Sequence, residues 1–194
     1  MENNDMDNME KVCVLCGEPL SRYGNKKING GMLCRNCIKA ASPWLEDEDY
    51  LKMDLEAFKK HLDYRNANLE KIDAFHCDKK VEGKYTLYLD EENKDFVISK
   101  RKDIKKENAD VLKLDDIGEI SIYEEGYPDS DDVDICFAVK MNGGQIEDIR
   151  FRVNEFPGLE KGGEDHEKSI KLAMDYLDAF ENEDGLDFEQ VEGE

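Results

Sequence analysis

Two pairs of cysteines near the N-terminus constrain this chain more than any other feature. Each pair has the spacing Cys-x-x-Cys, and 17 residues lie between them; the four are Cys13, Cys16, Cys34 and Cys37. Two such pairs at this separation are typical of a tetrahedral site that holds one zinc ion. The gap is long enough for a β-hairpin that brings the pairs together. The sequence therefore predicts a site for one Zn²⁺.

Four thiolates would complete the coordination of this zinc and leave no open position for water, so we expect it to be structural. A segment of about thirty residues has too little core to fold alone, and a structural zinc contributes on the order of 10 kcal/mol. Iron in a rubredoxin-like site is the main alternative, because four cysteines also suit iron. A redox switch, in which oxidation releases the zinc, is left open.

The charge of the chain limits its partners. The 194 residues have a formal net charge of −21, whose far field repels nucleic acids and anionic membranes. Residues 11–41, however, contain six basic residues and one acidic residue, Glu18, which gives +5 there and leaves −26 elsewhere. The cysteine-bearing segment is thus a basic patch on an acidic protein.

No targeting signal is visible in the sequence. The first residues are acidic and lack the basic and apolar regions of a secretory signal. No apolar run approaches the ~18–20 residues of a membrane span. We therefore expect a cytoplasmic protein, where reducing conditions favour metal binding over disulfides.

Helical and strand periodicities divide the chain. A hairpin turn is expected at Asn29-Gly30-Gly31 and a short helix at 34–41, whose dipole would favour thiolates. A long helix is predicted from Asp54, its N-cap, to Phe75. Its apolar stripe has helical spacing and consists of Leu55, Phe58, Leu62, Leu69 and Ile72.

From Gly83 the apolar period changes to two, which predicts five or six antiparallel strands. A helix over 165–180 follows, with a stripe at Ile170, Ala173, Met174, Leu177 and Phe180. One helix after an antiparallel sheet indicates the α+β class, with the helix closing the β-rich domain. The predicted segments are a disordered acidic arm at 1–10, a Cys₄ zinc finger at 11–45, a helical linker at 46–80, the β-rich domain with its C-terminal helix at 81–181, and a disordered acidic tail at 182–194.

The stretches CVLCGEPL and GGMLCRNCIKAASPWL resemble the knuckle, hairpin and helix of a GATA-type treble-clef finger. Together with HLDYRNANLEKIDAF and IRFRVN, they resemble an uncharacterised bacterial family, a domain of unknown function with an N-terminal zinc finger, over roughly residues 11–155. This resemblance implies a finger followed by a β-rich domain, and it supplies no known activity. The β-rich part and its closing helix also resemble pleckstrin-homology-like domains in the order of their elements.

Two basic clusters are candidate anion sites. In the finger, Arg22, Lys26, Lys27 and Arg35 could meet nucleic acid. The acidic run 46–49 lies where a GATA-type finger would contact phosphate, so docking on an acidic surface is the favoured alternative. The second cluster, Lys100, Arg101 and Lys102 with Lys105 and Lys106, could hold phosphate or a lipid headgroup. An ordinary charged loop, balanced by Glu91, Glu92 and Asp103, is favoured instead.

Other reactive residues have simpler explanations. Cys136 fits a buried strand position, and Cys77 beside His76 lacks a third, orienting group. His61 and His166 lie on predicted helices and are expected to be solvated. The acids Asp129, Asp131, Asp132 and Asp134 fail the EF-hand pattern and are expected to form a solvated loop.

The sequence contains no nucleotide-binding, zinc-protease or serine-nucleophile motif, so we expect a protein that is not an enzyme. The favoured function is a protein-interaction or regulatory adaptor with a structural zinc and another protein as its partner. One alternative is a nucleic-acid-binding protein that uses the basic finger. Another is an acidic mimic of nucleic acid, which rests on net charge alone.

Overall fold

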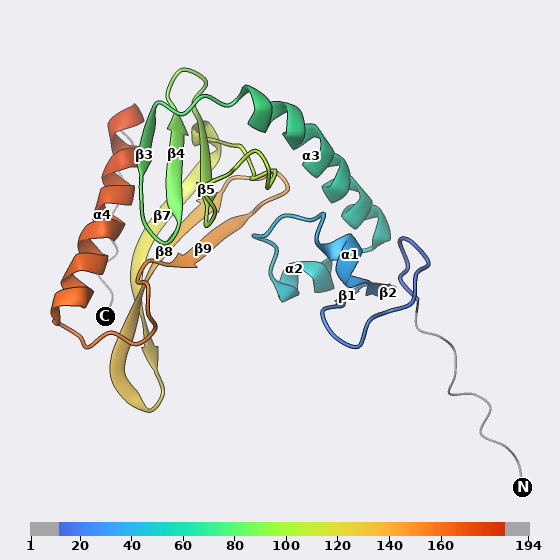
Figure 1. The fold of residues 1–194 in the computed structure, drawn as a ribbon, viewed down its shortest axis with the longest axis horizontal. Helices are drawn as coiled ribbons and strands as arrows, with labels where there is room; N and C mark the ends of the chain where they lie inside the picture. The colour runs from blue at the N-terminus through green and yellow to red at the C-terminus, as the bar shows by residue number, and fades with distance from the viewer. Residues whose placement is uncertain (1–11, 185–194) are drawn as a thin grey trace, which may run out of the picture. The chain divides into compact units, whose positions relative to one another are not determined.

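The computed structural model describes residues 12–184, and the chain divides after Ala67 into two compact units (Figure 1). The predicted arm at 1–10 lies outside the described residues. Of the predicted tail, the part up to Asp184 is helical rather than disordered, and the rest lies outside them too. Helices and antiparallel sheets both occur, and the C-terminal element of the described residues is a helix. The α+β class is therefore confirmed.

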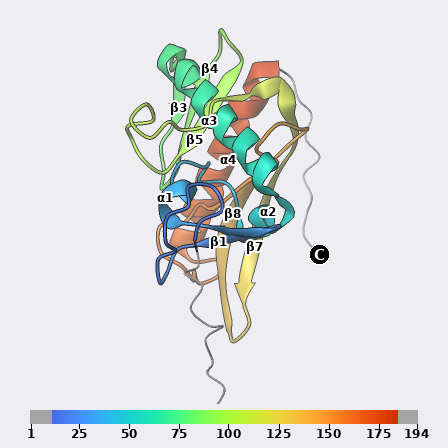
Figure 2. The ribbon, with the colours of Figure 1, turned by 90° about the vertical axis from the view of Figure 1, so that its right-hand side faces the viewer.

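Unit 1 is a small hairpin surrounded by short helices. Its elements are β1 (Lys26–Ile28), β2 (Gly31–Leu33), α1 (Arg35–Ile38), α2 (Asp47–Lys52) and the first part of α3 (Leu55–Ala74). The predicted turn joins β1 to β2, and Gly30 adopts the left-handed φ of +91° that glycine tolerates. The predicted helix at 34–41 is shorter than expected, a single turn. Helix α2 lies beside β1 (Figure 2).

The core of unit 1 joins cysteines to ordinary apolar side chains. Ile28, Leu33, Tyr50 and Phe58 are buried together with two of the four cysteines. Tyr50 belongs to α2, and Phe58 to α3, which begins at the predicted N-cap: the Asp54 carboxylate accepts a hydrogen bond from the Ala57 amide at 2.8 Å. The first part of the predicted linker 46–80 thus packs into unit 1.

Unit 2 contains two antiparallel sheets. The four-stranded sheet has the order β3-β4-β5-β6, and the three-stranded sheet has the order β7-β8-β9. Their strands are β3 (Lys79–Val81), β4 (Thr86–Asp90), β5 (Asp95–Ser99), β6 (Leu112–Lys113), β7 (Ile117–Tyr127), β8 (Ser130–Met141) and β9 (Asp148–Arg152). The strands β3 and β6 are the shortest of these, with three and two residues.

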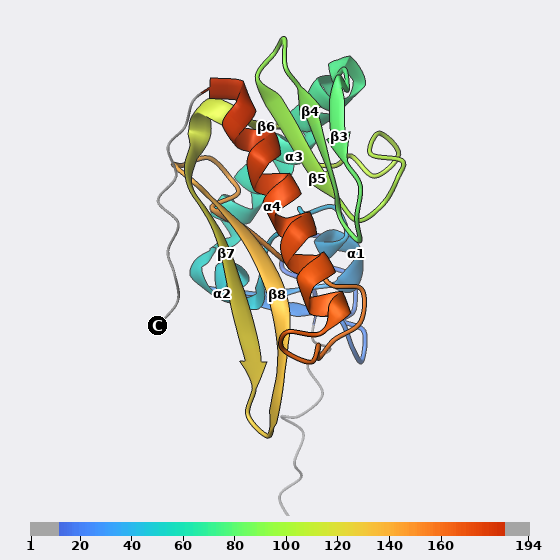
Figure 3. The ribbon, with the colours of Figure 1, turned by 90° about the vertical axis from the view of Figure 1, so that its left-hand side faces the viewer.

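Helix α4 (Glu164–Asp184) packs against both sheets (Figure 3). Phe180 meets Phe96 of β5 edge to face at 5.3 Å between ring centroids, and Tyr176 meets Phe137 of β8 at 5.5 Å. Val97, the neighbour of Phe96, is also fully buried, in a second cluster with Ile72. The four-stranded sheet is therefore covered on both faces, so β5 lacks the polar face that alternation predicts.

Polar residues lie within the buried faces of both long helices. In α3, His61, Arg65 and Asn68 are buried, whereas Leu69 of the predicted stripe is 48% exposed. In α4, His166 and Ser169 are buried, whereas Ile170 is exposed. The expectation that His61 and His166 are solvated is therefore wrong. Each ring has a polar partner that compensates for burial: the Ser42 amide for His61 at 3.0 Å, and the Glu124 carboxylate for His166 at 2.9 Å.

Among residues 12–184, no helix combines the length and the apolarity that crossing a membrane requires.

Candidate metal centre

The first cysteine pair lies in a tight loop, as predicted for a knuckle. The amide of Cys13 donates to the carbonyl oxygen of Glu18 at 2.8 Å, and the amide of Gly17 donates to that of Cys13 at 2.9 Å. Gly17 has a φ of +74°, which closes this turn at no steric cost. The amide of Val14 donates to the carbonyl oxygen of Met32, which fixes the loop beside β2.

The second pair begins where β2 ends. Cys34 directly follows β2, and its carbonyl oxygen accepts the hydrogen bond from Ile38 that starts the turn of α1. Cys37 lies within that turn. Because Gly31 of β2 has no side chain, Val14 can pack directly against it, where a Cβ atom would overlap the valine. This close approach holds the knuckle against β2, the strand that leads into Cys34 and α1.

The four thiol groups lie close together, around one possible metal position. The Sγ atoms of Cys13 and Cys37 are 3.8 Å apart, those of Cys16 and Cys34 are 3.7 Å apart, and all four lie within 4.8 Å of one another. A tetrahedron with metal–sulfur bonds of about 2.3 Å has edges of about 3.8 Å. The separations are far too long for disulfides, and the four thiols are free. The donor set therefore fits one tetrahedral metal ion, and the predicted cluster is confirmed; the geometry suits zinc and iron alike.

The backbone around the cluster already favours a thiolate. Burial raises the pKa of Cys13, but amides of Cys16, Cys34 and Leu15 donate to its sulfur, so the net effect lowers the pKa to about 6. Burial raises the pKa of Cys37, and the three neighbouring thiols raise it further. Four negative sulfurs at this distance repel one another, and a dication removes that repulsion. The direct amide contacts replace the predicted helix dipole, since α1 is a single turn.

The basic residues of the finger differ in their surroundings. Lys26 pairs with Asp47 and lies near the ring of Tyr50, and its contact with nucleic acid stays a prediction. Lys27 is exposed. Arg22 stacks over the ring of Tyr23 at 5.2 Å, and this ring is 71% exposed. The side chain of Arg35 passes over Gly24 of the same loop.

The second basic cluster forms a turn at one side of unit 2. The Arg101 guanidinium pairs with Glu107 at 2.5 Å, and the Lys105 ammonium donates to the carbonyl oxygen of Asp73 at 2.7 Å. Glu107, not the predicted acids, thus balances Arg101, while Lys100 and Lys102 are exposed. Anion binding at Lys100, Arg101 and Lys102 stays a prediction.

The two remaining cysteines are far from the metal cluster in sequence. Cys136 is buried, as predicted, and burial raises its pKa to about 11. Burial also raises the pKa of the exposed Cys77, the opposite of what a thiolate nucleophile requires. The ring of His76 lies 3.4 Å from Asp78.

Sequence reasoning missed one polar cluster altogether. Asp134, expected in a solvated loop, is only 7% exposed, so that expectation is wrong. Its oxygens accept hydrogen bonds from Asn154 at 2.8 Å, the Gly158 amide at 2.8 Å, the Tyr127 hydroxyl at 2.7 Å and Arg152 at 3.2 Å. Burial raises its pKa, but these four donors together lower it below the ordinary value. The position of Asp134 between Val133 and Ile135, inside an apolar run, was the available signal.

Comparison with protein families gives one match. Residues 11–61 match the family described as a domain of unknown function, DUF4428. This range contains all four cysteines and ends inside α3, within unit 1. The expected resemblance to an uncharacterised family is thus confirmed for residues 11–61, a shorter range than the predicted 11–155.

No curated protein and no solved structure matches the chain. The pleckstrin-homology-like resemblance stays a prediction.

Proposed function

We propose that the chain is a non-enzymatic protein-interaction or regulatory adaptor. One structural Zn²⁺ would hold its unit 1 together. The closed set of four thiols is the observation that carries this proposal. Four sulfur ligands complete a tetrahedron, so a bound zinc would have no position for water or substrate. The metal would then act on folding: it would join the knuckle to α1 in a unit whose core is small.

The surface of unit 1 supports an interaction function. Tyr23 is 71% exposed, Leu51 54% and Val12 46%. Exposed side chains of this size lower solubility unless a partner covers them. Tyrosine and arginine are also enriched at the centres of protein interfaces. Folding of these segments around the metal would link metal loading to partner binding.

The test is capture of partners on tagged full-length protein, with the Cys34→Ser variant and a nuclease-treated sample alongside. We expect a protein that is retained by the wild type after nuclease treatment and lost with Cys34→Ser. Recovery of no protein by the wild type, or equal recovery by the variant, would contradict the proposal. Metal content of the purified wild type, measured by mass spectrometry, distinguishes zinc from iron.

A second candidate function, nucleic-acid binding, is favoured by one specific arrangement. The loop 21–25 holds Tyr23 outward, because the Ser21 hydroxyl donates to the carbonyl oxygen of Tyr23 and the Asn25 amide donates to that of Ser21. The exposed ring of Tyr23 could stack on an unpaired base, while Arg22 beside it and Arg35 of α1, whose side chain passes over Gly24 of this loop, could contact phosphates. Binding of a labelled single-stranded oligonucleotide should then fall steeply with salt and be abolished by Arg22→Glu with Arg35→Glu. Unchanged binding in that variant would exclude this candidate.

A further inference from the structure

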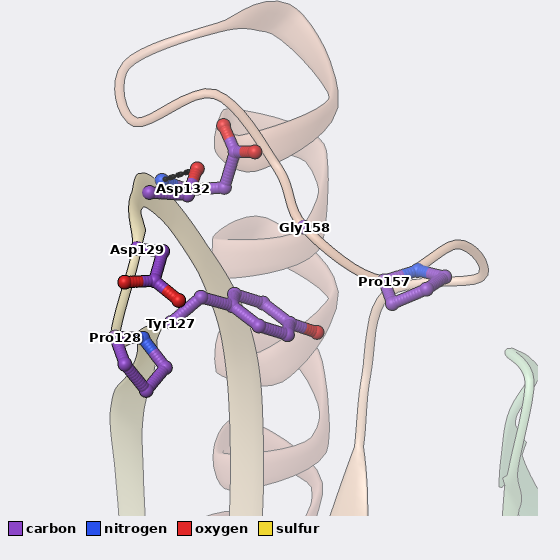
Figure 4. Close-up of a pocket in the computed structure, with 7 residues that line it drawn as sticks. Tyr127, Pro128, Asp129, Asp132, Pro157 and Gly158 are labelled. Carbon is purple, nitrogen blue, oxygen red and sulfur yellow. Dashed lines mark hydrogen bonds between the residues drawn. The ribbon is translucent and has the colours of Figure 1, made fainter.

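An open cleft lies at the tip of the β7–β8 hairpin (Figure 4). One wall is the turn between these strands, and the other is the segment that follows β9. The cleft has a volume of about 350 Å³ and is lined by Tyr127, Pro128, Asp129, Ser130, Asp132, Pro157 and Gly158. Figure 4 shows the ring of Tyr127 reaching from the hairpin toward the side on which Pro157 lies. All these residues belong to unit 2.

Asp134 fixes both walls of this cleft. One carboxylate oxygen accepts from the hydroxyl of Tyr127, and the other accepts from the amide of Gly158. Val133 and Leu159 exchange backbone hydrogen bonds of 2.9 and 2.8 Å between the same two segments. Because both walls are held by buried or paired groups, a ligand would bind a preformed surface and would not have to order it.

The cleft combines apolar faces with negative charge. Tyr127, Pro128 and Pro157 supply flat apolar surfaces, and Phe156, the residue before Pro157, is 75% exposed, the largest exposed fraction of any large apolar residue described in the chain. Asp129 and Asp132 line the same opening. Residues 68–184, moreover, contain 32 acidic residues and 17 basic ones. The surrounding field therefore attracts cations and repels nucleic acids.

We infer that this cleft docks a basic segment of a partner protein, in which arginine or lysine side chains alternate with small residues. The cationic groups would stack on the rings of Tyr127 and Phe156 and pair with Asp129 and Asp132, while the small residues would pack on the prolines. A peptide fits better than a small cation, because Phe156, which directly precedes Pro157 in the chain, offers a second exposed apolar side chain to a longer ligand. This inference rests on the proposed protein-interaction function and names the chemistry of one partner.

The probe for this site is a fluorescein-labelled peptide in which arginine alternates with glycine and proline, together with the same peptide containing citrulline, which is neutral, in place of arginine. Anisotropy would be measured with the full chain at low ionic strength. Phe156→Ala and, separately, Asp129→Asn with Asp132→Asn should each weaken binding of the arginine peptide by about fivefold or more. Phe156 is so exposed that its truncation should leave the fold intact.

A matched variant separates this site from general attraction to an acidic protein. Asp115→Asn with Asp116→Asn removes the same charge from another exposed position of unit 2 and should leave affinity unchanged. Equal losses in the two double variants, unchanged binding by Phe156→Ala, or equal binding of the citrulline peptide would overturn the inference. The proposed function would survive such a result if a captured protein still depended on Cys34. If the wild type captured no protein, or Cys34→Ser captured it equally well, while the peptide still bound, the proposed function alone would be contradicted.

Discussion

Asn68 on α3 accepts a hydrogen bond from the backbone amide of Val111, 43 positions later in the chain, at 2.9 Å. Its side-chain amide donates to the carbonyl oxygen of Ala109 at 2.7 Å and to the Asn108 side chain at 2.8 Å. Asn68 is fully buried, and Asn108 has a φ of +49°, which asparagine tolerates better than most residues. One side chain thus determines the path by which the chain enters β6.

Asn68→Ala should lower the free energy of unfolding of unit 2 by about 1–3 kcal/mol, because it leaves the Val111 amide and the Ala109 carbonyl buried without this partner. Urea unfolding followed by far-UV circular dichroism measures the effect. Asn66→Ala, on the exposed face of the same helix, should change stability little. Alanine has the higher helix propensity, so propensity favours the helix in both variants; equal effects of the two substitutions would show that the hydrogen bonds of Asn68 add no net stability.

Gly31→Ala should separate the knuckle from the hairpin. The added Cβ would overlap the side chain of Val14, and overpacking of this kind typically costs about 1–3 kcal/mol. We expect weaker metal retention in a competition with a chelator, measured with a colorimetric metal indicator. Gly126→Ala is the control, because no atom lies within 4 Å of its added Cβ. Unaltered retention in Gly31→Ala would mean that the loop moves aside without disturbing the cluster.

Cys34→Ser should lower the metal content and unfold unit 1 while leaving the sheets of unit 2 intact. Cys34 is 5% exposed and belongs to the core of unit 1, so its loss removes a ligand and a packing contact together. Metal would be measured by mass spectrometry and folding by the dispersion of NMR signals from each unit. The exposed Cys77, replaced by serine, is the control and should keep full metal content. A Cys34→Ser protein with full metal content would refute the four-cysteine assignment.

The cysteine cluster was predictable because its signal is local. Two short spacings and a glycine-rich turn determine which atoms meet, whatever the rest of the chain does. The two long helices were predictable in position, but the side that each one buries was not, as α3 illustrates. Its buried face contains His61, Arg65 and Asn68, and a search for apolar periodicity assigns such residues to solvent.

Asp134 shows more clearly which features cannot be predicted from the sequence alone. Its burial depends on donors from Tyr127, Asn154 and Gly158, which only the folded sheet brings together. An isolated sequence contains the donors but not their convergence, so four nearby acids appeared equivalent. In the structure, Asp134 is buried in β8, while Asp129 and Asp131 are exposed.

The stability of unit 2 should depend on acid through Asp134. Its pKa is lower in the folded chain than in the unfolded chain, so its contribution is complete above the unfolded value of about 3.9 and is lost as the pH falls toward the folded value. All four of its partners are donors, which an asparagine amide cannot fully satisfy. Asp134→Asn should therefore destabilise unit 2 by about 1–3 kcal/mol at pH 7, and its difference from the wild type should shrink below pH ~4. Urea unfolding, followed through NMR signals of β8 at pH 7 and below pH ~4, measures this difference in the free energy of unfolding under both conditions. The exposed Asp131→Asn should match the wild type at every pH. A difference for Asp134→Asn that stayed constant from neutral pH into acid would show that packing, not the carboxylate charge, holds the two walls together.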